Sequence, residues 1–421
     1  MEGWKCEVLS DVIHLINGGT PSTTNENYWN GEIPWLSVDD FNTGKRFVYD
    51  AAKKISKLGL ENSATKLLDV GDIIISARGT VGVIAQLASK MAFNQSCYGI
   101  KQKLDDLSID YIYYYLCYYF WAIGVVKTGS TFDTITKKTF DEISISFPTT
   151  RIEQHKITTI LSTIDSSIVQ TEQLIAKYKK IKQGLMHDLL TYGIDQNGTI
   201  RNPQTHTFVG KNGMMVPEEW AVKTLERCAK INGRVGWKGY IVSDLRDFGA
   251  LTLGAMHIDK ANKLDLSNSV YLSHEKFVES PEIMVKKGDV LVVQRGSIGK
   301  VVCIDKEIGE ATINPSMILL NNFTISSKYV YYFLISKEGQ KQIEFSTSQT
   351  GVPMISQIQV KNFNIPIPAP IEQQKIVSIL DQQESLIESE QTNLAKLQKL
   401  KQGLMQDLLT GKVRVKADIL I

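Results

Sequence analysis

The stretch KQGLMHDLLT at residues 182–191 returns as KQGLMQDLLT at residues 401–410, with nine of its ten letters unchanged. Shorter matches precede it in the same order, at offsets that drift only between 215 and 220 residues. They pair Trp4 with Trp220, Asn17 with Asn232, residues 71–82 with 288–299, Asn94 with Asn314, Tyr111 with Tyr329, and Ile152 with Ile371. A repeat of this length is too long for a solenoid. It indicates one module, about half of the chain, that occurs twice.

The first part of each copy, about 150 residues, predicts a mixed α/β fold. Short apolar runs bounded by glycine and aspartate, such as residues 73–75 and 290–293, are typical of strands that are buried on both faces. We call these two parts head one and head two.

The second part of each copy predicts one long helix. Apolar residues recur at alternating spacings of three and four, which is typical of a helix that packs along a partner helix. A capping pattern at residues 150–153 marks the start of the first helix, and Gly193 and Gly411 follow the last apolar turns. The predicted seam between the helices consists of Ile157, Ile160, Ile164, Ile168, Leu174, Tyr178, Ile181, Leu185, Ile376, Ile379, Leu386, Leu397, Leu400 and Leu404.

Two similar copies predict an α+β protein with pseudo-two-fold symmetry. We expect two mixed α/β domains at opposite ends of a pair of long, antiparallel coiled-coil helices, because packing the two seams together turns the second helix back along the first. The predicted segments are a first domain at 1–149, a first helix at 150–192, a linker at 193–216, a second domain at 217–369, a second helix at 370–411 and a tail at 412–421.

Composition leaves the partner open. The chain has 47 basic and 45 acidic side chains, so its net charge of +2 neither favours nor excludes a nucleic acid. Its five cysteines form no Cys-x-x-Cys pair, which indicates reduced thiols. The polar N-terminus does not resemble a signal peptide, and the most apolar stretch, 111–126, is shorter than a membrane span. We therefore expect a cytoplasmic protein without a membrane partner.

Catalytic signatures are missing from the sequence. Gly299-Lys300 and Gly210-Lys211 are not followed by the serine or threonine of a phosphate-binding loop, and no His-Glu-x-x-His motif is present. The Asn-Pro-Pro-aromatic signature of amino-methyltransferases is also absent, because Ser316 follows Asn314-Pro315. We predict no catalytic residue, no metal site and no cofactor in this chain.

A mixed α/β part followed by a long helix that ends in Lys-x-Gly-Leu-x-x-Asp-Leu-Leu-Thr, all repeated once, resembles the specificity subunits of type I restriction–modification enzymes. The pattern Pro-x-Pro-x-x-x-Glu-Gln before the second helix, formed by Pro366, Pro368, Glu372 and Gln373, also looks like that family. So does the segment 189–195 after the first helix. The resemblance covers essentially the whole chain.

The resemblance implies a division of labour. Each head is then a target-recognition domain for one half of an interrupted double-stranded DNA site, and the helices dock two methyltransferase subunits. Those subunits supply the S-adenosylmethionine site, and separate ATP-dependent motor–nuclease subunits complete the restriction enzyme. Three alternatives stay open: a related type II assembly, a helical adaptor that does not bind DNA, and a free-standing methyltransferase or nuclease.

The duplication also sorts the candidate DNA-binding residues. A residue in the same place in both heads cannot by itself explain two different half-sites, so such residues are better candidates for scaffold or phosphate contact than for base reading. These residues are Arg78, Thr80, Asn94, Arg295, Ser297 and Asn314.

Base reading is expected from the segments that differ between the heads, which are 20–46, 128–138, 234–263 and 346–350. For any one of their polar residues, a solvated loop position is the simpler interpretation. The candidates, with Lys300 beside the second Arg-Gly loop, are Asn25, Asn27, Lys45, Arg46, Ser130, Thr131, Lys137, Lys138, Arg234, Lys238, Arg246, Lys300, Gln349 and Thr350.

Overall fold

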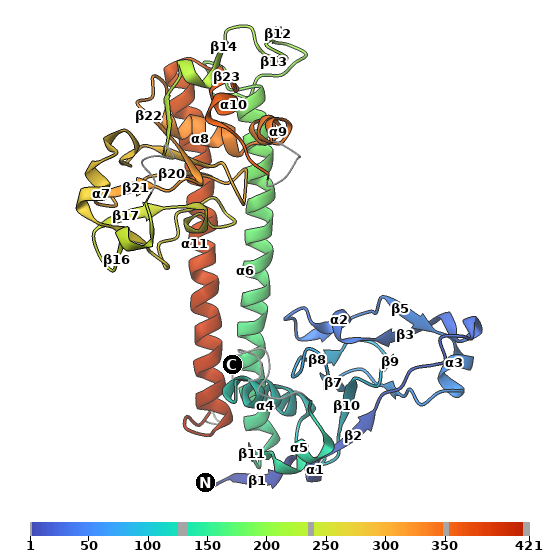
Figure 1. Cartoon of the computed structure of the whole chain (residues 1–421). Coiled ribbons are helices and arrows are strands. Elements are labelled where there is room, and N and C mark those ends of the chain that lie inside the picture. The colour runs from blue at the N-terminus through green and yellow to red at the C-terminus, as the bar shows by residue number, and fades with distance from the viewer. Residues whose placement is uncertain (1, 125–133, 235–239, 348–352, 416–421) are drawn as a thin grey trace. The chain divides into compact units, whose positions relative to one another are not determined.

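The structure, a computed structural model, describes residues 2–124, 134–234, 240–347 and 353–415 (Figure 1). The chain folds into two compact units. One comprises Met1–Ile175 and Ser389–Ile421, and the other comprises Ala176–Glu388. Each unit therefore joins one head to the beginning of the helix that follows it and to the end of the helix that follows the other head. This is the composition expected of a duplicated module.

Head one is built on three groups of strands. Strands β1 and β11 pair antiparallel, a five-stranded sheet has the order β2-β10-β7-β8-β4, and a four-stranded sheet has the order β5-β3-β9-β6. The strands are β1 (Trp4–Val8), β2 (Ile13–Asn17), β3 (Trp29–Leu36), β4 (Phe47–Val48), β5 (Lys53–Ile55), β6 (Leu67–Leu68), β7 (Ile73–Ser76), β8 (Ile84–Leu87), β9 (Met91–Phe93), β10 (Cys97–Gln102) and β11 (Ser144–Pro148). The helices are α1 (Leu9–Val12), η1 (Glu26–Tyr28), α2 (Val38–Phe41), α3 (Lys57–Glu61), α4 (Ile109–Ala122) and α5 (Lys137–Glu142).

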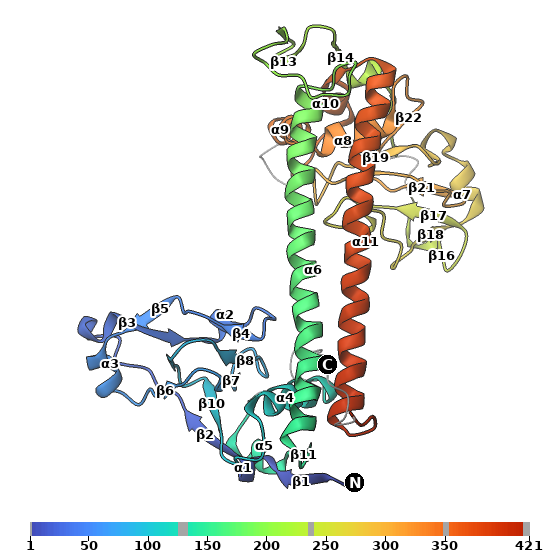
Figure 2. The same ribbon diagram turned by 180° about the vertical axis from the view of Figure 1, so that it is seen from behind.

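Head two follows a similar plan, and its sheets are seen from behind in Figure 2. Strands β14 and β23 pair antiparallel, and two four-stranded sheets have the orders β15-β22-β19-β20 and β16-β18-β17-β21. After the hairpin of β12 (Phe208–Lys211) and β13 (Met214–Pro217), the strands are β14 (Ala221–Thr224), β15 (Lys230–Gly233), β16 (Leu245–Arg246), β17 (Ala250–Leu253), β18 (Tyr271–Leu272), β19 (Val290–Val293), β20 (Val301–Cys303), β21 (Ala311–Ile313), β22 (Met317–Asn321) and β23 (Asn364–Ile367). The helices are η2 (Leu225–Arg227), η4 (Val242–Asp244), η5 (Ala255–His257), α7 (His274–Val278), η6 (Pro281–Ile283), α8 (Ser327–Ile335), α9 (Lys337–Ser346) and α10 (Gln357–Lys361).

The central strand of each head is buried on both faces, as the apolar runs predicted. In β7, Ile73 and Ile75 pack into a core with α4 and the long helices, whereas Ile74 packs into a second core with residues such as Leu36 and Phe41. Strand β19 divides head two in the same way, because Val290 and Val292 face one core and Leu291 and Val293 face the other. Burial of one such side chain stabilises the folded state by about 1.5–3 kcal/mol. These central strands therefore contribute strongly to the stability of each head.

The two long helices are α6 (Arg151–Thr191) and α11 (Pro370–Leu409), and they run antiparallel within each unit. In the first unit, the Lys401 ammonium lies 2.5 Å from the Asp165 carboxylate. In the second, the Gln383 amide donates to the Tyr178 carbonyl over 3.1 Å. Two mixed α/β heads with antiparallel long helices confirm the predicted fold class.

A tyrosine fixes each head to the helix that follows it. The Tyr114 hydroxyl of α4 donates to Asp165 of α6 over 2.8 Å, and the Tyr332 hydroxyl of α8 donates to Asp381 of α11 over 2.6 Å. Burial raises the pKa of both tyrosines, so both remain protonated donors. The two heads are therefore anchored by equivalent contacts.

The glutamine of the Glu-Gln pair near the start of each long helix has the same role in both copies. Gln154 accepts from the Ser108 amide at 2.8 Å and donates to the Pro148 carbonyl at 2.8 Å. Gln373 makes the equivalent contacts with Ser326 at 3.0 Å and with Pro368 at 2.9 Å. The resemblance motif at this point of the chain thus closes the turn from β-strand to long helix.

The preceding glutamate holds the segment that follows the other helix. Glu153 binds the Arg414 guanidinium at 2.8 Å, and Glu372 binds the Arg201 guanidinium at 2.5 Å. Equivalent ion pairs therefore hold Arg201 of the linker after α6 and Arg414 of the tail after α11.

The seam between the helices differs in part from the prediction. Ile181, Leu386 and Leu400 are 39%, 47% and 49% exposed and lie outside it. The interior positions are taken instead by Leu161, Ile175, Leu380, Ile387 and Met405.

Buried polar residues explain the difference. Thr171 and Gln383 are buried in the helix faces, where the Thr171 hydroxyl donates to the Ser167 carbonyl. A seam predicted from apolar residues alone omits such buried polar positions. It assigns neighbouring apolar residues to the seam instead. Helix geometry, with 3.6 residues per turn, sets the buried face regardless of residue type.

Candidate nucleic-acid interface

Three segments of head one, far apart in the sequence, meet at one end of the five-stranded sheet. The Ala77 amide donates to the Ser96 carbonyl over 2.8 Å, and the Ile135 amide donates to the Ala77 carbonyl over 2.9 Å. These bonds join the loop between β7 and β8, the turn between β9 and β10, and the segment that leads into α5. We call residues 77–82, 94–96 and 134–138 the head-one loop cluster.

Head two repeats this junction. The Gln294 amide donates to the Ser316 carbonyl over 2.9 Å, and the Ile355 amide donates to the Gln294 carbonyl over 3.0 Å. Residues 294–299, 314–316 and 353–357 form the head-two loop cluster. In each head the backbone thus brings together segments that the sequence patterns indicate separately.

Asn94 and Asn314 shape the turns of these clusters. The Asn94 side-chain oxygen accepts from the Ser96 amide at 3.0 Å, and that of Asn314 accepts from the Ser316 amide at 2.9 Å. Such a bond to the backbone two residues on is a common way for asparagine to stabilise a turn. This geometry favours the scaffold interpretation of the pair over phosphate contact.

The Arg-Gly loops present their polar side chains to solvent. Arg78, Thr80, Arg295 and Ser297 are all exposed. Among the residues that the structure describes, Arg78 forms no ion pair, and the Arg295 guanidinium donates only to the sulfur of Met354, at 3.3 Å. Exposed guanidinium groups at the same place in both heads suit contact with phosphate, which carries no sequence information.

Lys137 and Lys138 lie in the first turn of α5, next to the head-one loop cluster, and both are exposed. Lys138 faces Glu142 across 3.7 Å on the surface, a contact that stabilises little. Five further candidates lie outside the described residues: Ser130, Thr131, Lys238, Gln349 and Thr350.

Arg46 lies at the opposite end of β8 from the head-one loop cluster, and its side chain has a structural role. Its guanidinium donates to Gln86 at 2.6 Å, to Tyr114 at 3.1 Å and to Asp110 at 2.6 Å. It also lies about 5 Å from the ring centres of Tyr113 and Tyr114. This placement argues against the prediction that Arg46 reads a base.

The other candidates in this segment differ in their environments. Asn25 caps the short helix η1 by accepting from the Asn27 amide at 3.1 Å, so its side chain has a local structural role. Asn27 and Lys45 are exposed. Their side chains are accessible to a ligand, but they are not part of the loop cluster.

In head two, Arg234 is buried rather than accessible. Its side chain is 6% exposed and donates to the Ile313 carbonyl at 2.9 Å and to the Thr312 hydroxyl at 3.0 Å. Burial lowers the pKa of this guanidinium. This position does not suit the expected base-reading role, because the guanidinium N–H groups that would bind guanine point into the protein.

The side chains of Arg246 and Lys300 donate hydrogen bonds to backbone carbonyl groups. Arg246 is exposed but donates to the carbonyls of Ser243 and Leu245 at 2.6 and 2.8 Å. Lys300 donates to the Ile258 carbonyl at 2.6 Å. Lys300 thus supports the fold of head two beside its Arg-Gly loop.

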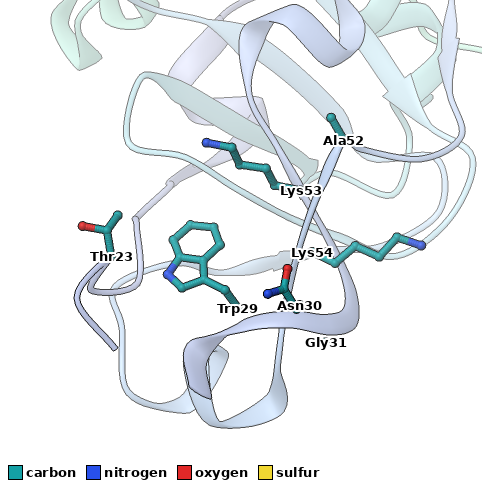
Figure 3. A pocket seen from close by; sticks show the side chains of 7 residues that line it. All are labelled: Thr23, Trp29, Asn30, Gly31, Ala52, Lys53 and Lys54. Carbon is teal, nitrogen blue, oxygen red and sulfur yellow. The ribbon is translucent and has the colours of Figure 1, made fainter. Parts of the chain in front are cut away.

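A hollow in the four-stranded sheet of head one was not apparent from the sequence (Figure 3). It has a volume of about 590 Å³ and is lined by Thr23, Trp29, Asn30, Gly31, Ala52, Lys53 and Lys54. Two stretches with twenty residues between them form it, so no local motif could have revealed it. An asparagine with a tryptophan and two lysines is a set of side chains that suits a nucleic acid.

Two further properties concern metal ions and membranes. Within the described ranges, no group of three or more His, Cys, Asp or Glu side chains is placed to hold a metal ion. In the same part of the chain, every helix is too short or too polar to cross a membrane.

Comparison with known proteins supplies the family context. The family described as the type I restriction modification DNA specificity domain matches residues 1–183 and 242–399. The type I restriction enzyme MjaVIII specificity subunit of Methanocaldococcus jannaschii is 25% identical over 426 residues, which cover 99% of this chain and 94% of that protein. The EcoBI specificity subunit of Escherichia coli is 21% identical over 430 residues, with coverage of 98% and 86%.

Solved structures share the fold. The crystal structure of a type I restriction–modification S subunit from M. genitalium has a TM-score of 0.59 at 16% identity and covers 96% of both chains. A chain from a study of complex assembly and conformational transition in a type I restriction–modification system has a TM-score of 0.59 at 17% identity and covers 98% of this chain and 99% of that one. At these identities the likeness concerns the fold alone.

Proposed function

Because this chain belongs to the type I restriction–modification DNA specificity family, we propose that its two loop clusters bind the two halves of one interrupted double-stranded DNA site. The chain has the role of a DNA sequence-specificity subunit. Binding to a duplex requires accessible cations, and Arg78 and Arg295 supply one exposed guanidinium in each cluster.

The repeated junction of backbone hydrogen bonds carries this proposal. Ala77 with Ser96, and Gln294 with Ser316, hold two loop clusters of the same construction. The exposed side chains around them differ: Lys137 and Lys138 follow the junction in head one, whereas residues 357 and 358 at the same place are Gln and Ile. Equal scaffolds with unequal surfaces suit two half-sites of different sequence.

Partner binding is proposed to occur on the long helices. Exposed apolar side chains occur at matching places: Ile152 and Ile371 are 60% and 70% exposed, and Ile181 and Leu400 are 39% and 49% exposed. Apolar residues in water favour a protein partner. Because each position occurs twice, we propose two methyltransferase subunits, one for each copy of the module.

The proposed division of chemistry follows from the sequence. S-adenosylmethionine and ATP are assigned to the methyltransferase and motor–nuclease subunits, and this chain is assigned no catalytic step. The missing phosphate-binding loop and the missing methyltransferase signature support this assignment. Cellular DNA as the ligand also makes the cytoplasm the proposed place of action.

Single-molecule mapping of methylated adenines tests the proposal. DNA is taken from cells that express this chain with its methyltransferase subunits, and we expect one interrupted motif with two unequal halves. A motif without an unspecified interval, or no methylation that depends on this chain, would contradict the proposal. A related type II assembly gives the same motif but differs in which subunits copurify.

A gel-shift experiment separates the proposal from the adaptor alternative. The chain with its methyltransferase subunits should bind a duplex that carries the mapped motif more tightly than one in which a half is scrambled. Alone, the homogeneous chain should neither methylate nor cut DNA. Equal binding of both duplexes would favour an adaptor.

A further inference from the structure

We propose that Asn30 reads a base of the first half-site and that Lys53 and Lys54 hold the neighbouring phosphates. This inference rests on the proposed function and assigns the hollow of head one to DNA. Figure 3 shows the Asn30 amide beside the Trp29 ring, with the two lysine side chains extending to either side.

A bulge in β3 places Asn30 at this hollow. Both Trp29 and Ile33 lie opposite Ile55 of β5, so the intervening residues leave the regular pairing. Asn30 has a φ of 59°, a left-handed conformation that asparagine accepts more readily than most residues. A bulge of this kind redirects a side chain away from the sheet, and it often occurs at binding sites.

Gly31 allows the bulge to lie close to its neighbour strand. A Cβ atom at this position would lie only 2.4 Å from the Ile55 carbonyl oxygen, so a larger residue could not be accommodated without moving the backbone. The conformation of Asn30 is therefore imposed by the packing of β3 against β5. A backbone held in this way has less conformational entropy to lose when its side chain binds a ligand.

The chemistry of the free groups fits DNA. The Asn30 side chain is exposed and makes no hydrogen bond within the described residues. A carboxamide offers one acceptor and one donor edge, which matches the N6 and N7 atoms of adenine.

The lysines are placed to contact phosphate. Lys53 has no ion-pair partner among the described residues. Lys54 lies 3.6 Å from Asp50, and these two side chains are 43% and 62% exposed. An exposed pair of this kind is weak and can be exchanged for a phosphate.

The hollow adjoins the head-one loop cluster. The Thr20 hydroxyl donates to the Gln95 side chain in the turn of that cluster, and Thr23, three residues further, lines the hollow. The Trp35 indole donates to the Gly19 carbonyl over 3.0 Å and meets the Trp29 ring edge-on at 5.2 Å. Residues 19–35 therefore link the hollow to the head-one loop cluster through direct contacts.

Head two lacks this set of side chains. The parallel pairs Leu36 with Phe93 and Leu253 with Ile313 align β3 with β17. By this register, Val270 and Tyr271 stand at the places of Lys53 and Lys54. Leu245 and Ala250 both lie opposite Leu272, as Trp29 and Ile33 both lie opposite Ile55, so Arg246 stands at the place of Asn30. A reader that occurs in only one head affects only one half-site, as a specificity-determining residue must.

Glycine at position 30 provides the sharpest test. Asn30→Gly removes the amide but accepts the positive φ, so the bulge is kept. In the complete complex with methyltransferase subunits, we expect one position of the first half-site to become degenerate, with discrimination there reduced roughly 5- to 150-fold. The second half-site should be read as before. Methylation of the unchanged motif with unchanged discrimination would overturn the assignment.

Lys53→Ala tests the phosphate contact, with Lys103→Ala as the matched control. Lys103 is also exposed and unpaired among the described residues, but it follows the end of β10 that is distant from the loop cluster. Lys53→Ala should weaken binding to all sequences and lower the slope of log affinity against log salt by about 0.9, whereas Lys103→Ala should change neither. Equal salt slopes for both variants would contradict a phosphate contact at Lys53.

The wild-type complex distinguishes this inference from the proposed function. If the wild type reads no interrupted motif, the proposed function fails. If the wild type reads one and Asn30→Gly reads the same one, only the role of Asn30 fails. Thermal unfolding of each variant shows whether head one remains folded.

Discussion

In both heads, a basic residue of a head-specific segment forms an ion pair that attaches the segment to the rest of the fold. The acidic partner lies on a different helix in each head. Arg46 binds Asp110 at the start of α4, whereas Lys263 lies 2.9 Å from Glu384 of α11 and also binds Glu388. Burial of Glu384 is offset by its two lysine partners, which hold its pKa below the ordinary value. The difference teaches that a basic residue in a variable segment can serve attachment rather than recognition.

Making the two heads identical is the strongest way to test their independence. Residues 1–200 contain head one and α6, and alone they expose the helix face that normally meets α11. We expect two copies to pair antiparallel through this face, with a true two-fold axis. With methyltransferase subunits, the dimer should methylate an interrupted palindrome of the first half-site. Light scattering reports the mass and methylation mapping reports the site.

The buried polar residue Thr171 and its neighbour Ser167 weaken this face, so the dimer is expected to be only moderately stable. A monomer without DNA preference, or a site that still contained the second half, would contradict the independence of the heads.

Replacing one head sharpens the same comparison. A chimera with residues 1–148 from another family member should recognise a new first half-site and keep the second. The physical reason is that each head has its own cores and meets its helix through its own tyrosine and glutamine contacts. Methylation mapping decides the outcome, and a change in both halves would show that the heads are coupled.

Asp289 and Asp72 occupy equivalent turns but differ in environment. Both accept a backbone amide, from Lys286 at 2.8 Å and from Asp69 at 2.7 Å, but among the described residues only Asp72 forms an ion pair, with Lys101 at 3.1 Å. Burial raises the pKa of Asp289 to about 6. Since this value lies above that of the unfolded chain, charged Asp289 costs stability above pH 6, and the cost disappears as pH falls towards 4.

Asp289→Asn keeps the acceptor and removes the charge. We expect a gain in head-two stability of at most about 3 kcal/mol at pH 8, and none at pH 4. Urea unfolding across this pH range measures it. A gain that did not depend on pH would show that the charge of Asp289 is not the cause.

Arg46 and Arg246 give the smallest contrast. Arg46→Ala removes three side-chain hydrogen bonds and should destabilise head one by about 2 kcal/mol. Arg246→Ala removes only contacts to neighbouring carbonyls and should change stability by less than about 0.5 kcal/mol. Denaturant unfolding compares the two. Equal losses would mean that the contacts of Arg46 do not stabilise head one.

The fold was predictable because the same motifs occur in the same order and at similar spacing in both copies of the module. Residues 73–75 and 290–293 reveal buried strands, and the two matching decapeptides reveal matching helix ends. The seam was less predictable, since Thr171 and Gln383 occupy buried places that an apolar pattern leaves out.

The candidate site was predictable only in outline, since its side chains depend on distant partners. Arg46 looks accessible in the sequence, but Gln86 and Asp110, 40 and 64 residues away, decide its orientation. Asn30 and Lys53 look unremarkable until β3 and β5 bring them to one hollow. Equivalence between the copies could identify shared scaffold residues such as Asn94, whereas residues unique to one head have no counterpart from which to infer a role.

The double-faced central strands have a consequence for how such a protein evolves. In head one, Ile73 and Ile75 face the core that α4 and the long helices share, while Ile74 faces the core around Leu36 and Phe41 of the head-specific side. A substitution on the second side need not be matched by one on the first. The strand therefore separates a side that can change with the target from a side whose packing against the long helices must be kept, and β19 gives the second copy the same freedom.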